Sequence, residues 1–269
     1  MLRWLLQAAP PTAPSLDWLT SDERLRADSF RFEKRRNDWL NGRYAAKRLV
    51  ARHLRERTGL PVPLSFLEIG TEASGSPFAR LSPEAPPVAG VEPGRRLPVS
   101  LSISHSGGRA LAALVPSGGE GPAAAVGADV ERVEPRLATF ARDYFTAGEL
   151  ASMPGDEGPE RDLAVTAVWS AKEAVLKALG LGLTVDTRSV GIDLSAAASP
   201  AAPEGLAPGE PGWEPFGVSA DGALLSGSSV HGYLRSSAGF VLTLAVRLPS
   251  AAGADPVHAL AAGAVPGRE

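Results

Sequence analysis

The stretch VGADVERV, residues 126–133, decides the fold class because it alternates like a half-buried strand and carries two carboxylates. On such a strand, Asp129 and Glu131 project from one face and Val130 projects from the other. Neighbouring carboxylates repel each other unless a cation lies between them, and Mg²⁺ prefers carboxylate oxygens together with waters and phosphates. An isolated pair of this kind is more often a solvated strand face, so its interpretation depends on the rest of the chain.

A second stretch, WSAKEAVLKALG at residues 169–180, has the periodicity of a helix. Trp169, Glu173 and Lys177 recur at intervals of one helical turn and therefore lie along one stripe. Glu173 and Lys177 thus present a carboxylate and an ammonium side by side. Taken alone, they are an ordinary helix-surface pair worth about 0.2–0.5 kcal/mol.

A third stretch, ISHSGG at residues 103–108, places Ser104 and His105 where a strand opens into a glycine turn. Free backbone N–H groups in such turns bind anions, although a polar hairpin turn is the commoner meaning of the pattern. A serine hydrolase is not indicated, because adjacent strand residues point to opposite faces and no G-x-S-x-G motif is present.

Basic residues crowd the region before residue 60, in a chain whose net charge is −3. The overall charge gives no general attraction to nucleic acid or to an anionic membrane. Most of these basic side chains are expected to be solvated, but arginine pairs bidentately with phosphate, so the cluster could hold a polyanion. Its members are Arg24, Arg26, Arg31, Lys34, Arg35, Arg36, Arg43, Lys47 and Arg48.

Outward from these stretches, helices followed by strands are predicted twice over, which indicates an α+β fold of two halves of similar size. No repeat is visible in the sequence itself. Thr146 and Glu149 form a capping box that begins a short helix. Other helices are expected over 21–57, with a break near 30–33 and a stop at Gly59, and over 161–179. Strands are expected at the first residues and over 65–69, 98–104, 110–115, 124–131, 228–235 and 240–247.

Glycine and proline gather in stretches that predict the connections. We expect one half over 1–116, a linker over 117–122, the second half over 123–248 and a disordered tail over 249–269. Residues 196–213 are expected to form a loop or to be disordered. The chain has no cysteine, which excludes disulfides and thiolate chemistry and favours a cytoplasmic location. No apolar run is long enough to span a bilayer.

Together, in this order and spacing, the motifs resemble the large, pseudo-dimeric (Sfp-type) 4′-phosphopantetheinyl transferases. That family has a G-x-D-x-E strand and a W-x-x-K-E-A helix, which correspond to residues 127–131 and 169–174. Arg43 in WLNGR, the Ser104-His105 pair and the F-T-x-x-E segment at 145–149 agree as well. The resemblance implies two α+β halves forming a pseudo-dimer, with coenzyme A in the cleft between them.

The resemblance also implies roles for individual residues. Asp129, Glu131 and Glu173 would share one Mg²⁺, and Glu173 would take the proton of the serine that is modified. The implied catalytic set is Glu173, Lys177 and His105. The implied coenzyme A-binding set is Arg24, Arg26, Arg43, Ser104, His105, Lys172 and Lys177. The reaction would move 4′-phosphopantetheine from coenzyme A to a serine of an apo acyl or peptidyl carrier protein, and the enzyme would be a monomer.

One departure from the family concerns the nucleotide. The family usually has Gly-Lys-Pro ahead of the glycine turn, whereas this chain has Gly75-Ser76-Pro77. Arg80, or Arg95 and Arg96, are candidates to replace the missing lysine. The segment 136–152 is the expected docking surface for the carrier, although the carrier itself and its pathway, such as polyketide or nonribosomal peptide biosynthesis, are not specified by the residues.

Two other classes of function stay open at this point. A pyrophosphatase would use the same carboxylates with water as the nucleophile. A module that binds coenzyme A or a carrier without catalysis would keep the cleft but transfer nothing.

Overall fold

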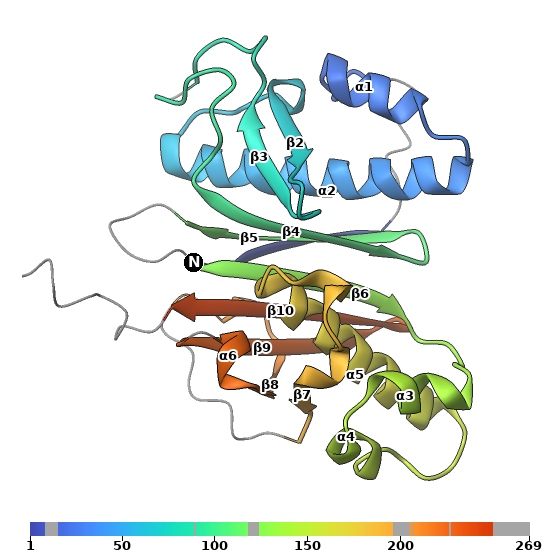
Figure 1. Ribbon diagram of the computed structural model, residues 1–269. Coiled ribbons are helices and arrows are strands. Elements are labelled where there is room, and N and C mark those ends of the chain that lie inside the picture. The colour runs from blue at the N-terminus through green and yellow to red at the C-terminus, as the bar shows by residue number, and fades with distance from the viewer. Residues whose placement is uncertain are drawn as a thin grey trace, which may run out of the picture.

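The computed structural model describes residues 1–8, 16–88, 90–117, 124–195, 205, 207–225 and 227–249. The fold is mixed α+β, as predicted. Two antiparallel sheets lie one above the other, and each carries a long helix on its outer side (Figure 1). No helix in the described ranges combines the length and the apolar character that a membrane span needs.

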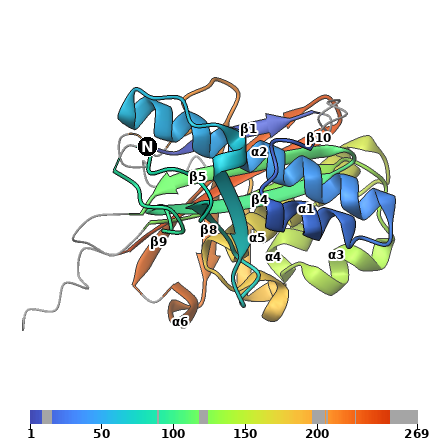
Figure 2. The same cartoon turned by 90° about the horizontal axis from the view of Figure 1, so that it is seen from above.

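The first set of elements, up to residue 116, builds a three-stranded sheet with the strand order β1-β5-β4 and a separate hairpin of β2 and β3. The long helix α2 packs across the sheet (Figure 2). The bounds are β1 Arg3–Gln7, α1 Ser21–Asp28, α2 Glu33–Thr58, β2 Leu67–Thr71, β3 Pro77–Leu81, β4 Val99–Ser106 and β5 Arg109–Pro116, with a 3-10 turn at Leu64–Phe66.

The second set of elements builds a five-stranded sheet with the order β6-β10-β9-β8-β7, on which the helix α5 packs. The bounds are β6 Ala125–Arg132, α3 Ala138–Tyr144, α4 Ala147–Ala151, α5 Pro159–Ala178, β7 Val190–Asp193, β8 Glu214–Ala220, α6 Gly222–Leu225, β9 Ser228–Ser237 and β10 Phe240–Pro249.

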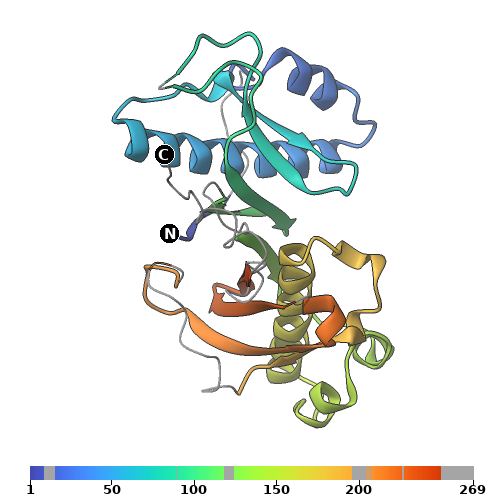
Figure 3. The ribbon, with the colours of Figure 1, turned by 60° about the vertical axis from the view of Figure 1, so that its left-hand side comes forward.

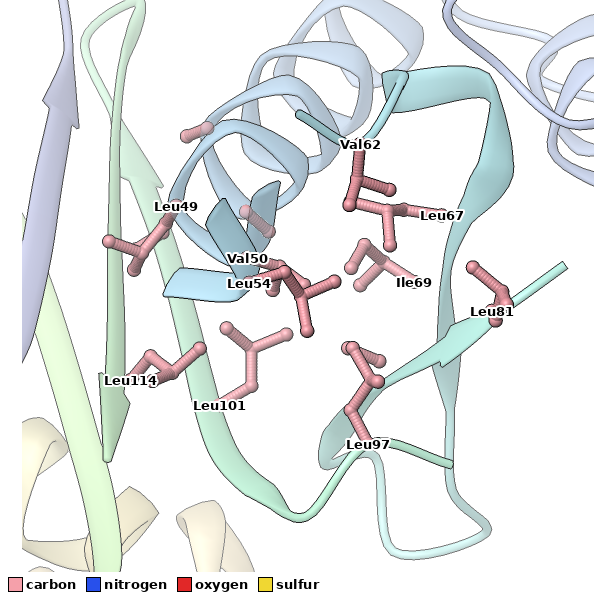
Figure 4. Close-up of a cluster of buried hydrophobic side chains, with 14 of the residues drawn as sticks. Leu49, Val50, Leu54, Val62, Leu67, Ile69, Leu81, Leu97, Leu101 and Leu114 are labelled. Carbon is pink, nitrogen blue, oxygen red and sulfur yellow. The ribbon is translucent and has the colours of Figure 1, made fainter. Parts of the chain in front are cut away.

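Three of the four apolar clusters among the described residues hold these layers together, and the fourth packs α1 against α2 through Ala27 and Leu40. One fills the space between α2, the β2–β3 hairpin and the first sheet, with Leu49, Leu67 and Leu114 fully buried (Figure 4). A second lies between α5 and the second sheet. The third joins the two sheets, because Leu111 of β5 and Leu244 of β10 belong to the same buried cluster. The two sheets therefore share an apolar interface rather than touching only at their edges. Figure 3 shows the first set of elements lying above the second.

A buried ion pair ties α1 to α2. Thr20 caps α1, and the Glu23 carboxylate closes a capping box by accepting from the Thr20 backbone N–H. The same carboxylate accepts from the backbone N–H of Ile69 on β2 and pairs with the ammonium of Lys47, which is fully buried. The carboxylate of one glutamate thus accepts from a backbone N–H at the start of α1 and from one on β2, and it also neutralises the buried ammonium on α2.

The same arrangement recurs in the second set of elements. Thr146 caps α4, and Glu149 completes the predicted capping box. The Glu149 carboxylate accepts from the backbone N–H of Ile192 on β7 and pairs with the ammonium of Lys172 on α5, at 3.0 Å. The two sets follow the same order of strand, short helix, long helix and further strands.

The predicted elements are largely confirmed. The break near 30–33, the helix end at Gly59, where the backbone is left-handed, and the turn that joins β4 to β5 are present. The strand predicted over 65–69 begins two residues later, because residues 64–66 form a 3-10 turn. The strands β3, β7 and β8 and the helices α3 and α6 were not predicted. Residues 118–123, most of 196–206 and 250–269 lie outside the described residues, so the predicted linker, loop and tail stay predictions.

Candidate active site

The predicted carboxylates gather where the two sheets meet edge to edge. The strand β6 is at the edge of the second sheet and lies beside β4, the edge of the first (Figure 1). The helix α5 packs closely on β6, because Gly127 leaves room for it: a Cβ there would lie 1.8 Å from the carbonyl oxygen of Ala174. This close approach brings the carboxylates of the strand next to those of the helix.

The carboxylate of Asp129 is buried and has three donors. Ser104 of β4 donates to Oδ1 at 2.7 Å, and the ammonium of Lys177 reaches the same oxygen at 2.7 Å. Ser170 of α5 donates to Oδ2 at 2.8 Å, while the hydroxyl of Thr243 on β10 lies 2.8 Å from that of Ser170. Three segments therefore fix the orientation of this carboxylate.

Glu131 lies further along the same face of β6, as predicted. Its Oε2 accepts from Ser106 at 3.3 Å and from Arg136 at 3.2 Å. Burial raises the pKa of Glu131 to about 7, and the negative charges of Asp129 and Glu173 act in the same direction. The three predicted carboxylates are thus electrostatic neighbours.

Glu173 and Lys177 form the predicted pair on α5, with the ammonium 3.1 Å from Oε2 of Glu173. Burial raises the pKa of Glu173, and the charge of Asp129 raises it further. Burial by itself would lower the pKa of Lys177, but Asp129 and Glu173 together raise it above its ordinary value. The ammonium therefore stays charged and bridges the strand carboxylate to the helix carboxylate.

A row of serines on β4 closes the seam between the two sheets. The hydroxyl oxygens of Ser100, Ser102 and Ser106 accept from backbone N–H groups of β6 at 3.0, 2.9 and 3.3 Å. Between them, Ser104 donates to Asp129. These side chains bridge two strand edges that do not pair directly, which satisfies the exposed N–H groups of β6.

The fit of this site to Mg²⁺ rests on its charges. Within the described residues, no three acidic or histidine side chains are arranged as a metal cage, and the ammonium of Lys177 lies between Asp129 and Glu173. The assignment of Mg²⁺ to Asp129, Glu131 and Glu173 therefore stays a prediction. Burial is the main cause of the raised pKa values of Glu131 and Glu173, and the negative charge of Asp129 adds to both. Such a site fits a cation that brings phosphate and water ligands with it.

The predicted role of Lys172 is corrected by its surroundings. Its ammonium is fully buried, pairs with Glu149 and donates to the carbonyl oxygens of Thr187 and Val190. It has no donor left for a phosphate. Lys172 is a structural lysine that ties α5 to α4 and β7.

Ser104 and His105 lie on opposite faces of β4. Ser104 was predicted to bind coenzyme A, but its hydroxyl proton is committed to Asp129, so it positions a carboxylate. Ile103 faces Gly42 of α2, and His105 follows on that same side of the strand, where it is exposed. The side-chain amide of Asn41 on α2 also donates to the carbonyl oxygen of Gly108, in the turn after β4. His105 therefore projects toward the α2 side and not toward the carboxylates.

The three predicted arginines do not form one group. Arg43 lies over the ring of Trp39 and donates to Thr71 of β2. Burial is the main cause that lowers the pKa of Arg43. The positive charge of Arg26 lowers it as well, so the two arginines lie close together. Arg24 instead donates to the carbonyl oxygen of Leu16. Only Arg26 and Arg43 are brought together.

A cleft of about 380 Å³ opens beside the seam and is lined by both sets of elements. Ser76 and Ser100 come from the first set, and Lys177, Gly180 and Arg247 come from the second. The Gly75-Ser76-Pro77 segment, in which the family's lysine is missing, therefore borders the same cleft as the end of α5. Arg247 is a basic residue of this cleft that sequence reasoning missed.

Sequence reasoning also missed the residues that orient the carboxylates: Ser106, Arg136, Ser170 and Thr243. Alternation of serines in VSLSISHS was a usable signal for Ser106, because it puts Ser100, Ser102, Ser104 and Ser106 on one face. No local pattern points to Thr243, which reaches the site only through the pairing of β10 with β6.

Beside the cleft, the strand β6 and the helix α5 meet around clustered carboxylates, and a match to a known family covers both elements. Residues 125–215 match the family model of the 4′-phosphopantetheinyl transferase superfamily. The resemblance is therefore confirmed at the level of that superfamily, for the segment from β6 to the start of β8. Membership in the large, pseudo-dimeric class stays a prediction.

Two named relatives extend the match beyond that segment. A Synechocystis protein assigned as a 4′-phosphopantetheinyl transferase is 27% identical over 184 residues, which cover 67% of this chain and 65% of the relative. A phosphopantetheinyl transferase of Thraustochytrium is 30% identical over 179 residues, which cover 61% of this chain and 54% of the relative. The chain thus spans only part of the length of the relatives it matches.

Proposed function

We propose that this protein is a transferase that moves 4′-phosphopantetheine from coenzyme A to a serine of an apo acyl or peptidyl carrier protein. The observation that carries the proposal is the cluster of Asp129, Glu131, Glu173 and Lys177 at the seam, beside a cleft lined by both sets of elements. The match of residues 125–215 to the transferase superfamily supports it independently.

In the proposed reaction, the serine oxygen attacks the β-phosphorus of the coenzyme A pyrophosphate. A new phosphorus–oxygen bond forms, the bond to the bridging oxygen breaks, and adenosine 3′,5′-bisphosphate leaves with the electron pair. Glu173, a half-buried carboxylate with a raised pKa, takes the serine proton directly or through a water. Lys177 offsets the negative charge that grows on the phosphate oxygens.

Mg²⁺ is part of the proposal. Asp129, Glu131 and Glu173 would hold it, and when bound it supplies charge neutralisation of the pyrophosphate. The proximity of the three carboxylates supports this assignment, because the charges of Asp129 and Glu173 both raise the pKa of Glu131 beyond the effect of burial. Ser104, Ser170 and Thr243 keep Asp129 in place, because each hydroxyl belongs to the hydrogen-bond network around that carboxylate.

The remaining polar groups are proposed to hold coenzyme A. Arg26 and Arg43 form a basic pair for one phosphate group, and exposed His105 is a further candidate on the α2 side of β4. Ser76 and Arg247 line the cleft and would meet the rest of the nucleotide. We further propose a monomeric, cytoplasmic enzyme, in keeping with a chain that carries both halves.

The decisive experiment incubates the protein with coenzyme A, Mg²⁺ and a panel of apo-carriers, and then measures each carrier's mass. We expect the mass to rise by one phosphopantetheine group with at least one carrier. The variant Glu173→Gln should lose transfer yet still bind coenzyme A. Glu160→Gln, which alters an exposed glutamate in the first turn of the same helix, should keep both properties.

The same experiment separates the two rival functions. Cleavage of coenzyme A with every carrier left unchanged would identify a pyrophosphatase that uses water as its nucleophile. Binding of coenzyme A without cleavage or transfer would identify a non-catalytic module. Either result would overturn the proposed transfer activity.

A further inference from the structure

The two β-hairpins give a residue-by-residue correspondence between the two sets of elements. In the β4–β5 hairpin, Ser106 pairs with Arg109 across a two-residue turn. In the β9–β10 hairpin, Ser237 pairs with Phe240 across a turn of the same length. The third strand of each sheet, β1 or β6, pairs with the second strand of its hairpin. Equivalent positions can therefore be counted from the turns.

This correspondence shows what replaces the carboxylates of β6. Counted along the strand pairing, Leu5 of β1 takes the position of Asp129, and Gln7 takes the position of Glu131. On the first hairpin strand, Arg235 of β9 takes the position that Ser104 has on β4. The acidic strand thus has an uncharged counterpart, and a neutral serine has a basic one.

The two long helices are aligned by their buried lysines, Lys47 and Lys172, which have matching partners. The residue that follows each lysine is Arg48 in α2 and Glu173 in α5, and four residues further come Arg52 and Lys177. The site around Asp129 has three carboxylates and one ammonium. Its counterpart has the three guanidiniums of Arg48, Arg52 and Arg235 and no carboxylate at the equivalent positions.

The counterpart also has a cleft between the two sets of elements. A cavity of about 430 Å³ adjoins one of about 350 Å³, and Trp4, Arg52 and Glu210 line both. The first cavity includes Arg3 and the second includes Arg235. The groove is thus lined by β1 and α2 of the first set and by Ala207, Gly209, Glu210 and β9 of the second, which are far apart in sequence.

Basic groups outnumber acidic ones along this groove. Glu56 pairs with both Arg3 and Arg52, and Glu210 lies 3.5 Å from Arg235. Arg48 donates to Gln7 at 2.8 Å and has a neutral partner there. An arginine-rich groove with an indole in its wall suits an anion, because guanidinium groups bind phosphate oxygens in pairs and the indole adds a flat apolar surface.

We propose that this groove, defined by Arg3, Trp4, Arg52 and Arg235, is a second binding site that takes a small phosphate-bearing anion. It is the charge-inverted counterpart of the carboxylate site. Arg52 of α2 and Arg235 of β9, which line the same cavity, supply the contacts to the phosphate. The ligand is either an inorganic phosphate or pyrophosphate, or the phosphate end of a nucleotide.

The test follows the indole N–H resonance of Trp4 by NMR, assigned through Trp4→Phe, while inorganic pyrophosphate or ADP is added without metal or carrier. We expect the resonance to shift in a saturable way. In Arg52→Gln/Arg235→Gln, the affinity should fall at least tenfold. The control Arg142→Gln/Arg188→Gln removes the same charge from exposed arginines that line neither cleft, and should leave the affinity within twofold.

The outcomes separate cleanly. Tighter binding of ADP than of pyrophosphate would identify a nucleotide as the ligand, and equal or weaker binding would identify the inorganic anion. A Trp4 resonance that does not move at millimolar anion, or a shift that persists unchanged in the double variant, would overturn the second site. Since the titration contains no carrier and no Mg²⁺, its result is independent of the proposed transferase activity.

Discussion

At the scale of single residues, Asp129 is the best-anchored group of the site. Its two oxygens are held by hydroxyls from β4 and α5 and by the ammonium of Lys177. Ser170 also lies within hydrogen-bond distance of Thr243, so the hydroxyl is oriented from both sides. A carboxylate fixed in this way presents its charge without having to reorganise when a ligand arrives.

We therefore predict that Ser170→Ala lowers transfer about 10- to 100-fold and raises the Mg²⁺ concentration needed for half-maximal rate, because Asp129 loses one of its orienting donors. Rates measured against Mg²⁺ concentration test this. Thr166→Val is the matched control: Thr166 is buried on the same helix, and its hydroxyl has no partner among the described residues. An unchanged Mg²⁺ requirement in Ser170→Ala would show that the serine only packs.

His53 gives a prediction about pH. Burial, aided by the positive charges of Arg3 and Arg57, lowers the pKa of His53 to about 4. Below about pH 6.5 the unfolded chain binds a proton that the folded protein does not accept until about pH 4. The folded state is therefore destabilised as the pH falls through this window, by about 3 kcal/mol at most.

Urea unfolding at pH 7.5 and at pH 4.5 measures this loss of unfolding free energy. His53→Leu should remove the histidine's share of the loss, whereas His105→Asn, at an exposed position, should retain it. An equal loss in wild type and His53→Leu would mean that other groups cause the acid destabilisation.

At this same scale, sequence patterns predicted which charged side chains lie together but not the groups that surround them. Asp129, Glu131, Glu173 and Lys177 were found because strand and helix periodicities fix which side chains share a face. The sequence patterns did not predict that Lys172 is buried and pairs with Glu149, which leaves it no contact with a phosphate. Whether a lysine points inward depends on what packs over it, and a helix pattern alone does not contain that information.

At the scale of elements, the two buried glutamate–lysine pairs have the same task. Glu23 with Lys47 and Glu149 with Lys172 each join a short capped helix, a long helix and a strand. Removing one partner leaves the other charge buried without compensation, which usually costs several kcal/mol. Substituting one member of either pair should therefore lower the stability of the fold and leave substrate binding unchanged.

We predict that Lys172→Met and Lys47→Met each lower the free energy of unfolding by about 3–5 kcal/mol. At a temperature where the variant stays folded, Lys172→Met should keep the wild-type KM for coenzyme A, because the ammonium has no contact left for a phosphate. Chemical unfolding and steady-state kinetics measure the two effects. A KM raised tenfold at full stability would restore Lys172 to the coenzyme A-binding set.

Elements with strong local signals were predictable, and those without them were not. The capping box at Thr146 and the left-handed glycine at 59 marked helix ends correctly. The strand β7 has only four residues and β8 follows a glycine- and proline-rich stretch, so neither offers a periodic pattern long enough to recognise. Both are held in place by pairing with the next strand of the sheet.

At the scale of the whole molecule, the shared core between the sheets makes the two sets of elements depend on each other. Leu111 of β5 is buried in the same cluster as Val130 of β6 and Leu244 of β10. The seam of serines adds hydrogen bonds beside this core. Long-range packing of this kind joins segments more than a hundred residues apart, which is why no window of sequence predicted how the halves meet.

We predict that Leu111→Ala, which leaves a cavity in the shared core, lowers the free energy of unfolding by about 2–5 kcal/mol and loosens both sheets at once. Hydrogen exchange should therefore speed up in β6 and β10 as well as in β4 and β5. Leu81→Ala is the matched control, because Leu81 is equally buried but belongs only to the core beneath α2. Its faster exchange should stay within residues 1–117. Faster exchange confined to that range in Leu111→Ala too would mean that the two sheets open separately, and the carboxylate site at their seam would then lack the rigid support on which the proposed chemistry depends.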